Sequence, residues 1–284
     1  MAVHPQIYRP YQGPLSGGWR RVAVVHHYAR RRMFDSRVLT ALFFICLLVP
    51  FVQLVMVYLS HNLSFLSQAG GLKALTVDNA FFQDYLHYSC VVAFIFVAFA
   101  APGLVAPDLA HGGLSIILAR PLTRWQYIAG KFSVLAILLS LLTWVPAEIV
   151  FLVQYNLATP DWRAHYYWIA GSLLLASALW IVVLSLLALA VSAWVKWRIV
   201  AAGALLGIYF LGSGFAAAAD AALQNNVGDL FSLMQLHLIA WSGFFDTPPT
   251  APGLTPVAWL ILLALAGGSL ALLYRRIRGM QVVR

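Results

Sequence analysis

Long apolar runs alternate with short polar segments along most of this chain. A helix needs about 20 consecutive, mostly apolar residues to cross the hydrocarbon core of a bilayer, and six runs meet that requirement. The pattern therefore predicts an all-α integral membrane protein with six transmembrane helices within residues 39–284. The approximate spans are Leu39–Leu59, Leu86–Ala106, Phe132–Tyr155, Trp168–Val191, Ile199–Ala219 and Pro256–Tyr274.

Residues 1–38 precede the first span and form a segment of their own. After an arm rich in Pro and Gly, apolar residues from Trp19 to about Asp35 recur every three or four positions, while Arg20, His27 and Arg31 fall on another face. This spacing predicts a cytoplasmic amphipathic helix in the plane of the membrane surface, with its cations among anionic lipid headgroups. Two roles stay open for this helix, a plain anchor or a brace for a partner.

Composition and charge agree with a membrane protein. The chain is 62% hydrophobic and 10% charged, whereas a soluble domain carries about 25% charged residues. Most of the 18 Lys and Arg residues lie in four segments: seven in the N-terminal segment, three in Pro107–Lys131, two in Ser192–Arg198 and four in the C-terminal tail. These segments fall on one side of a six-span chain, so the positive-inside rule places both termini in the cytoplasm. The net charge of +9 is then explained by the orientation of the chain in the membrane, and no nucleic-acid partner is expected.

A further apolar stretch, Val227–Phe245, could be counted as a seventh span. A seventh span would move the C-terminal arginines to the side opposite the other basic segments, against the positive-inside rule. It would also bury Asp229 and His237 in the bilayer, which is costly. We therefore expect an external helix between spans 5 and 6 that lies at the interface or dips partway into the membrane.

The connection Pro107–Lys131 differs from the others because it combines charged residues with helical patterning. Leu114, Ile117 and Leu118 share one helix face, two glycines precede them, and Pro121 ends the helix. The pattern predicts a short cytoplasmic helix between spans 2 and 3.

The residues after this proline predict how the third span begins. Thr123 and Gln126 have the spacing of a capping box, in which each side chain accepts a hydrogen bond from the other residue's backbone N–H. A short helix continuous with two spans can transmit movement from a cytoplasmic partner to the membrane, or it can simply cap the bundle.

The same connection resembles that of ABC-2 type transporter permeases, where an acidic residue, a Gly-containing turn, an Arg-Pro pair, an aromatic residue and a Gly-Lys pair join spans 2 and 3. The amphipathic N-terminal helix, the six spans and the long external segment before the last span are also similar. The resemblance implies a coupling helix that docks into a cleft on a separate ATPase subunit. The residues implied in coupling are Asp108, Gly113, Leu114, Ile117, Leu118, Arg120, Pro121, Arg124, Tyr127 and Lys131.

The resemblance also implies an assembly of two ATPase copies with two permease chains, as a homodimer or a heterodimer, in the plasma (inner) membrane of a prokaryote. The sequence contains no G-x-x-x-x-G-K-[ST] loop to cradle phosphates. We therefore expect that the chain is not itself an enzyme and binds no cofactor, with ATP and Mg on the partner ATPase. Its spans would form the translocation path, and the apolar composition favours export of a hydrophobic or amphiphilic substrate.

Three residues within the spans are candidates for other roles. Glu148 follows Pro146 and lies about 24 Å along the third span at 1.5 Å per residue, so it is a translocation-path candidate or a structural hydrogen-bond partner. Gly203 and Gly207 form a G-xxx-G pair in the fifth span, which permits close packing within the chain or in a dimer.

Two other classes of protein remain as alternatives. A secondary transporter, or a channel-like protein without an ATPase, would need ionisable residues near the midplane or an internal repeat, and Glu148 alone is thin support. An intramembrane enzyme would need a metal cluster or a nucleophile elbow. The eight His residues lie at span ends or in loops, so no metal site is expected.

Overall fold

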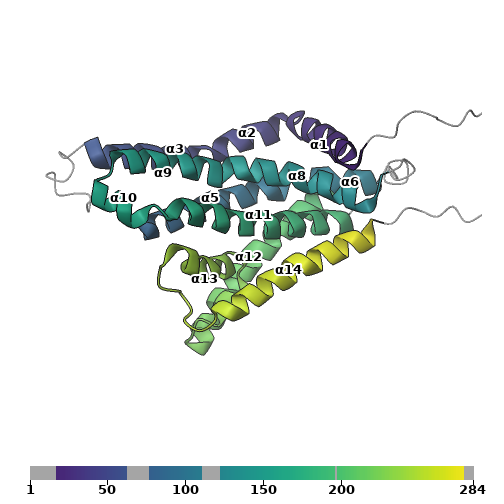
Figure 1. Ribbon diagram of the computed structural model, residues 1–284. Coiled ribbons are helices and arrows are strands. Elements are labelled where there is room, and N and C mark those ends of the chain that lie inside the picture. The colour runs from purple at the N-terminus through teal and green to yellow at the C-terminus, as the bar shows by residue number, and fades with distance from the viewer. Residues whose placement is uncertain (1–16, 63–76, 111–121, 196, 278–284) are drawn as a thin grey trace, which may run out of the picture.

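The computed structural model describes residues 17–62, 77–110, 122–195 and 197–277, and these residues are almost wholly helical (Figure 1). The helices are α1 (Gly18–Phe34), α2 (Arg37–Cys46), α3 (Leu48–Asn62), α5 (Asn79–Ala100), α6 (Pro102–Ala110), α8 (Arg124–Leu142), α9 (Trp144–Leu157), α10 (Pro160–Tyr166), α11 (Ile169–Trp194), α12 (Arg198–Leu223), the 3₁₀ turn η1 (Gly228–Phe231), α13 (Leu233–Phe245) and α14 (Thr255–Arg276).

Six helical stretches of the described residues are long and apolar enough to cross a membrane, which confirms the predicted number of spans. Each is longer than the apolar run that predicted it, because a spanning helix continues into the headgroup layers that flank the hydrocarbon core. The stretches are Arg37–His61, Asn79–Asp108, Arg124–Leu157, Pro160–Trp194, Arg198–Leu223 and Thr255–Arg276.

Prolines account for breaks in the first three spans. In the third span α8 ends and α9 begins on either side of Thr143, which has φ −113° and ψ −92°. Pro146 follows in the first turn of α9, and it has no N–H for the helical hydrogen bond to the preceding turn. The Thr143 hydroxyl donates to the backbone oxygen of Leu139 at 2.8 Å. Similar breaks lie just before Pro50 and at Pro102.

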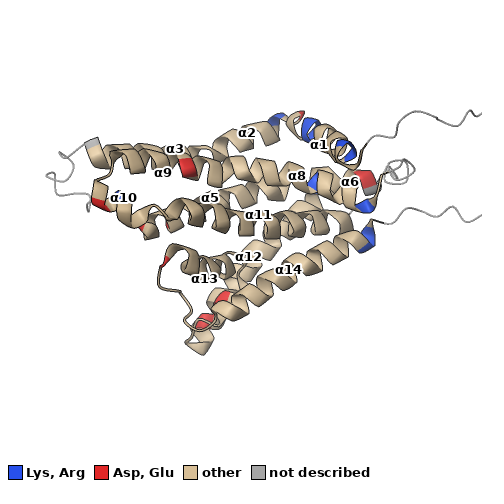
Figure 2. Ribbon diagram, in the orientation of Figure 1, with Lys and Arg blue, Asp and Glu red and all other residues tan. Residues whose placement is uncertain are grey.

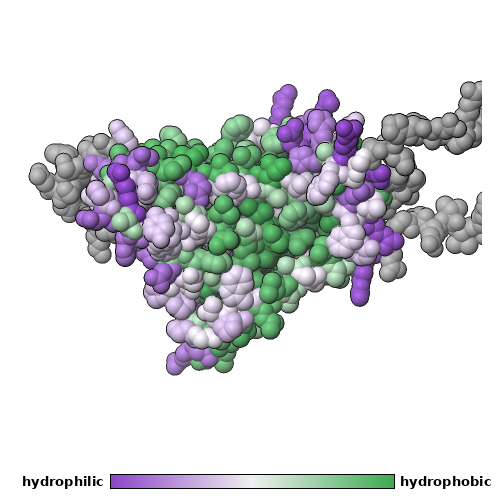
Figure 3. All heavy atoms as spheres, viewed as in Figure 1, coloured by the Kyte–Doolittle hydropathy of each residue, from purple (hydrophilic) through white to green (hydrophobic). Residues whose placement is uncertain are grey.

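The second and fourth spans form the core of the bundle. In their most apolar stretches 72% and 61% of the residues are buried, compared with 22% in the first, fifth and sixth spans. Helix α11 of the fourth span contacts α5, α6, α8, α9, α13 and α14. The three peripheral spans therefore present apolar surface that only lipid or another membrane protein can cover, and Figure 3 shows this surface as an apolar belt between two polar ends.

The two ends of the bundle carry opposite charge, as Figure 2 shows. We call one the basic end: it holds α1, the beginnings of α8 and α12, and the last turns of α6, α11 and α14. The other is the acidic end, where Asp78, Asp84, Asp161, Asp220, Asp229 and Asp246 lie near helix termini. Among the described residues, Arg163 in α10 is the one Lys or Arg residue at the acidic end.

The stretch expected as an external helix between spans 5 and 6 forms η1 and α13. Helix α13 has 13 residues, which is about 20 Å at 1.5 Å per residue and too short to cross a 30 Å core. It packs against α5, α11, α12 and α14 near the acidic end (Figure 1). His237 and Trp241 are fully buried there, and the Trp241 indole N–H donates to the backbone oxygen of Ala176 at 3.1 Å.

The amphipathic helix α1 has the bounds that its pattern predicted, within one residue at each end. Ala29 and Met33 on its apolar face are buried, and the helix packs along α8. Trp19, which the spacing assigned to the same face, is instead 87% exposed. Periodicity assigned Trp19 by its angle around the helix, but the neighbouring helix does not cover that side chain.

Candidate functional site

The connection that the sequence singled out joins two helices whose ends lie together at the basic end. Helix α6 ends at Ala110 and α8 begins at Arg124. The Thr123 hydroxyl accepts from the Gln126 N–H at 3.3 Å, and the Gln126 side-chain oxygen accepts from the Thr123 N–H at 3.0 Å. The predicted capping box is therefore confirmed. The candidates Gly113, Leu114, Ile117, Leu118, Arg120 and Pro121 lie outside the described residues.

Asp108, in the last turn of α6, is the centre of a polar network. One carboxylate oxygen, Oδ2, lies 2.8 Å from the Lys131 ammonium and accepts a hydrogen bond of 2.8 Å from the Tyr127 hydroxyl. Both partners come from the first two turns of α8, where a spacing of four residues places them on one helix face. Three of the residues that the resemblance implied are thus in direct contact.

Two further groups complete this network. The Lys131 ammonium also donates to the backbone oxygen of Leu104 in α6, at 2.7 Å. Arg32 of α1 lies 3.4 Å from the other Asp108 oxygen. Only 9% of the Lys131 side chain and 11% of the Asp108 side chain are exposed, whereas 56% of the Arg32 side chain is. The Asp108–Lys131 pair is therefore the buried part of the network, and Arg32 contacts Asp108 from the exposed side.

Helix α1 approaches α8 unusually closely at Gly130, which directly precedes Lys131. A Cβ atom at Gly130 would lie 2.6 Å from Cγ1 of Val25 and 3.3 Å from the backbone oxygen of Val22. Any side chain at position 130 would push the two helices apart. The Gly-Lys pair thus has two structural roles. Gly130 allows α1 to pack closely on α8, and Lys131 forms an ion pair with Asp108 of α6.

His26 makes a second polar contact between α1 and α8. Its Nδ1 atom lies 2.9 Å from the Ser133 hydroxyl. Partial burial lowers the pKa of His26 from its ordinary value of 6.5, and the nearby charges of Arg30 and His27 lower it further. His26 is therefore favoured in its neutral form at the interface.

The beginning of α8 is also tied to the sixth span. The Arg124 guanidinium carbon lies 5.6 Å from the centre of the Tyr274 ring, and the Trp125 ring stacks on the same ring at 4.8 Å. A cation over an aromatic face is a favourable contact. Arg124 is therefore separate from the Asp108 network and links α8 to α14.

Comparison with known families agrees with this arrangement. A profile described as "ABC-2 family transporter protein" matches residues 23–274. The chain belongs to the ABC-2 family. The resemblance inferred from the residues is thus confirmed, and the match includes Asp108, Lys131, Tyr127 and Arg32. No curated protein matches the chain. This ABC-2 protein is a multi-pass membrane component of an ABC transporter, from a family whose members are not themselves catalytic and generally work with an ABC ATPase.

Glu148 is separate from the Asp108 network. It lies in α9, the half of the third span nearer the acidic end. Its side chain is partly exposed, and it has no hydrogen bond or ion pair with any other described residue. A role for Glu148 in the translocation path stays a prediction.

The two glycines of the G-xxx-G pair lie on an open face of α12. A Cβ atom at Gly203 would meet nothing within 4 Å, and at Gly207 it would meet only Leu211 of the same helix. At Gly212, by contrast, a Cβ atom would lie 2.8 Å from the backbone oxygen of Phe231. Close packing within this chain therefore occurs at Gly212, while the face of Gly203 and Gly207 contacts no other helix among the described residues.

Sequence reasoning missed two members of the site. Arg32 lies 76 positions from Asp108, and it is one of three consecutive arginines with nothing to distinguish it. Gly130 belonged to the motif, but only the structure reveals that α1 occupies the space above it. Among the described residues, no three His, Cys, Asp or Glu side chains lie close enough together to hold a metal ion.

Proposed function

We propose that this ABC-2 protein couples to a separate ABC ATPase through the segment 111–121 and forms half of a translocation path. The observation that carries the proposal is the buried Asp108–Lys131 pair. It joins the two helices from which this segment emerges, within a chain whose family generally works with an ABC ATPase. Nucleotide binding and hydrolysis, with ATP and Mg, would take place on the partner.

The network suits a coupling role mechanically. Asp108 is three residues before the first position of the segment, and the capped start of α8 is three residues after its last. Because Asp108 binds both Lys131 and Tyr127, a force applied to the segment acts on the second and third spans together. Arg32 and Gly130 extend that connection to α1, so α1 would brace the coupling region in addition to anchoring it.

Coupling requires that the basic end face the cytoplasm, where ATP is available. The charge asymmetry of the bundle supports this orientation, because Lys and Arg are retained on the cytoplasmic side. Both termini would then be cytoplasmic, and the membrane would be the plasma (inner) membrane of a prokaryote.

We further propose that two permease chains pair through the open face of α12, with two ATPase copies beneath them. Small residues at a helix surface allow a second helix to approach closely. Gly203→Cys should therefore form a disulfide between two chains if the dimer is a homodimer. The native Cys46 and Cys90 are buried and would not interfere. Gly267→Cys on α14, a position with equal space around it, is the matched control.

The substrate that fits this path best is hydrophobic or amphiphilic, and transport would run outward. The interior of the bundle is apolar, and among the described residues Glu148 is the carboxylate that lies away from the ends of the spans. A strongly charged solute would lack partners along most of such a path.

The coupling proposal is tested by co-purification of the permease with its ATPase and by transport in vesicles. Leu118→Asp would place a charge on the apolar docking face. An unpaired buried charge costs about 3–5 kcal/mol, so co-purified ATPase should fall by about 100-fold or more. Arg120→Glu should weaken the complex by reversing a charge in the same segment. Arg275→Glu, at the same end of the molecule but outside the segment, should leave the complex intact.

A scrambled sequence over residues 111–119 is the stricter test, because it preserves composition and leaves Asp108 in place. Transport at the wild-type rate with this scrambled segment would refute coupling through it.

A further inference from the structure

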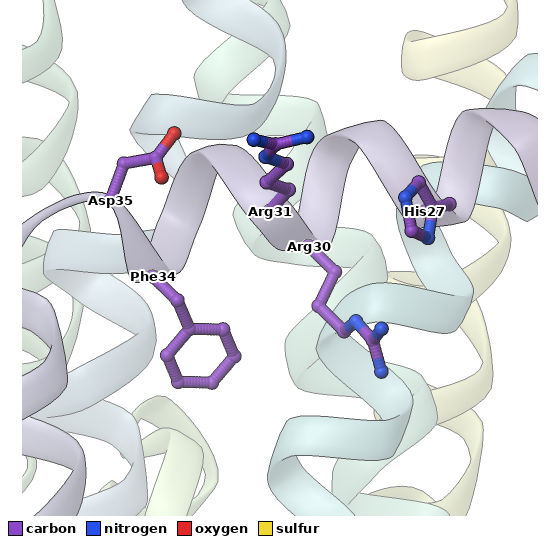
Figure 4. A pocket seen from close by; sticks show the side chains of 5 residues that line it. All are labelled: His27, Arg30, Arg31, Phe34 and Asp35. Carbon is purple, nitrogen blue, oxygen red and sulfur yellow. The ribbon is translucent and has the colours of Figure 1, made fainter.

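Helix α1 carries a pocket on the face that points away from the bundle (Figure 4). The pocket is lined by His27, Arg30, Arg31, Phe34 and Asp35. On a helix with 3.6 residues per turn, positions 27, 30, 31 and 34 form one stripe. Val25, which contacts α8 at Gly130, and the buried residues Ala29 and Met33 lie on the opposite stripe. Arg30 and Arg31 therefore take no part in the packing of α1 on α8.

The guanidinium groups of this pocket are available to a ligand. Arg30 and Arg31 are both exposed, and neither guanidinium forms a hydrogen bond or an ion pair with another described residue. Their neighbour Arg32, on the other side of the helix, is the one that contacts Asp108. Each guanidinium presents a planar set of N–H donors that matches a phosphate group. With one carboxylate at Asp35, the pocket keeps a net positive charge at neutral pH.

The pocket also has an apolar wall at the point where the first span begins. Phe34 packs edge-on against Phe43 of α2, with ring centres 6.1 Å apart, and part of its surface stays exposed. The spanning stretch starts at Arg37, two residues after the last pocket residue. A lipid whose chains lie along α2 could therefore place its glycerol region beside Phe34 and its headgroup beside the arginines.

The length of the first span sets the depth of the pocket. The stretch Arg37–His61 has 25 residues, which is about 37 Å at 1.5 Å per residue. The hydrocarbon core is about 30 Å thick and the headgroup layers add about 5–7 Å on each side. An upright span would thus place Arg37 about 4 Å outside the core. The pocket then lies in the headgroup layer, at the level of lipid phosphates.

From this geometry we propose that the pocket on α1 binds the phosphate of an anionic phospholipid, with Arg30 and Arg31 as its phosphate ligands and Phe34 against its glycerol region. Asp35 would accept hydrogen bonds from hydroxyl groups of the headgroup. The lipid holds the outer face of α1 while Arg32 and Val25 hold the inner face. The proposal does not depend on the ATPase partner or on which end of the bundle is cytoplasmic.

The test is native mass spectrometry of the purified full chain titrated with phosphatidylglycerol, with phosphatidylcholine as the zwitterionic comparison. The wild type should bind a first phosphatidylglycerol more tightly than later ones and more tightly than phosphatidylcholine. Each basic residue near an anionic surface contributes about 1 kcal/mol. Arg30→Gln with Arg31→Gln should therefore weaken this first site by about 30-fold.

The matched control removes the same charge outside the pocket, by Arg20→Gln with Arg275→Gln, and should leave the first site almost unchanged. Equal weakening by both pairs would mean diffuse attraction to a basic surface and would overturn the proposal. So would the absence of a preferred first lipid in the wild type.

Two further measurements separate a lipid headgroup from free phosphate. Phe34→Ala should weaken phosphatidylglycerol binding several-fold, because it removes the apolar wall without changing charge. Inorganic phosphate at the same concentration should fail to displace the lipid. Displacement by inorganic phosphate, with no effect of Phe34→Ala, would identify a site for soluble phosphate and overturn the lipid assignment.

Discussion

The Asp108–Lys131 pair allows a quantitative prediction, because both side chains are nearly buried and their partners are known. Asp108→Asn removes the charge but keeps an acceptor for Tyr127. The Lys131 ammonium would then retain the Leu104 backbone oxygen as its described partner. Breaking a buried ion pair by removing one partner costs about 3–5 kcal/mol, so we expect the free energy of unfolding to fall by that amount.

The other changes at this network should cost less. Lys131→Met leaves Asp108 with Tyr127 and Arg32, and we expect a loss of about 1–3 kcal/mol, the range for an unsatisfied buried group. Arg32→Gln should cost no more than about 1 kcal/mol, because exposed ion pairs contribute little. The double variant Asp108→Asn with Lys131→Met contains no unpaired buried charge in this network, and it should be more stable than Asp108→Asn alone.

The assay is equilibrium unfolding of the purified protein in mixed micelles with increasing SDS, arranged as a double-mutant cycle. A coupling energy of about 2–4 kcal/mol between Asp108 and Lys131 is expected, within the range for directly contacting residues. A coupling energy below about 0.5 kcal/mol, the level of additive sites, would mean that water screens the pair and would refute the reasoning.

Three further predictions concern α1 and the core. Gly130→Leu should destabilise the protein by about 1–3 kcal/mol, because the new side chain overpacks against Val25. The destabilisation should be measurable as faster proteolysis within α1. Gly203→Ala, at a position with open space, should leave the rate of proteolysis unchanged. Because the pKa of His26 is lowered in the folded state, the unfolded state gains a proton more readily than the folded state as pH falls below 6.5. Thermal stability should therefore decline between pH 7 and 5, and His26→Gln should show a smaller decline. Trp241→Ala should cost about 3–5 kcal/mol in SDS unfolding, and a smaller loss would contradict the tight burial of α13.

The spans were predictable because the bilayer imposes a simple requirement on them. Every backbone polar group in the hydrocarbon core needs a partner within the chain, so a spanning segment is a helix of set length and apolar composition. Leu39–Leu59 and the other five runs meet that requirement locally, with no knowledge of their neighbours. The capping box at Thr123 and Gln126 was predictable for the same reason, since both of its hydrogen bonds join residues three positions apart.

The short apolar stretch between spans 5 and 6 marks the limit of such reasoning. The positive-inside rule and the cost of burying Asp229 and His237 argued against a full span, and the apolar sequence suggested contact with the membrane. That α13 would instead bury His237 and Trp241 among α5, α11 and α14 depends on how those helices are spaced. No local pattern encodes that spacing.

The sequence by itself determined the class of this protein, the number of its spans, the amphipathic helix α1 and the motif around Asp108. All of these follow from periodicity, span length or residues near one another in the chain. Only the tertiary structure decided which groups meet: that Asp108 binds Lys131 and Tyr127, that Arg32 reaches it from α1, and that Gly130 is a contact point. The physical reason is that a bilayer fixes the form of each helix separately, whereas contacts between helices depend on the packing of the whole bundle.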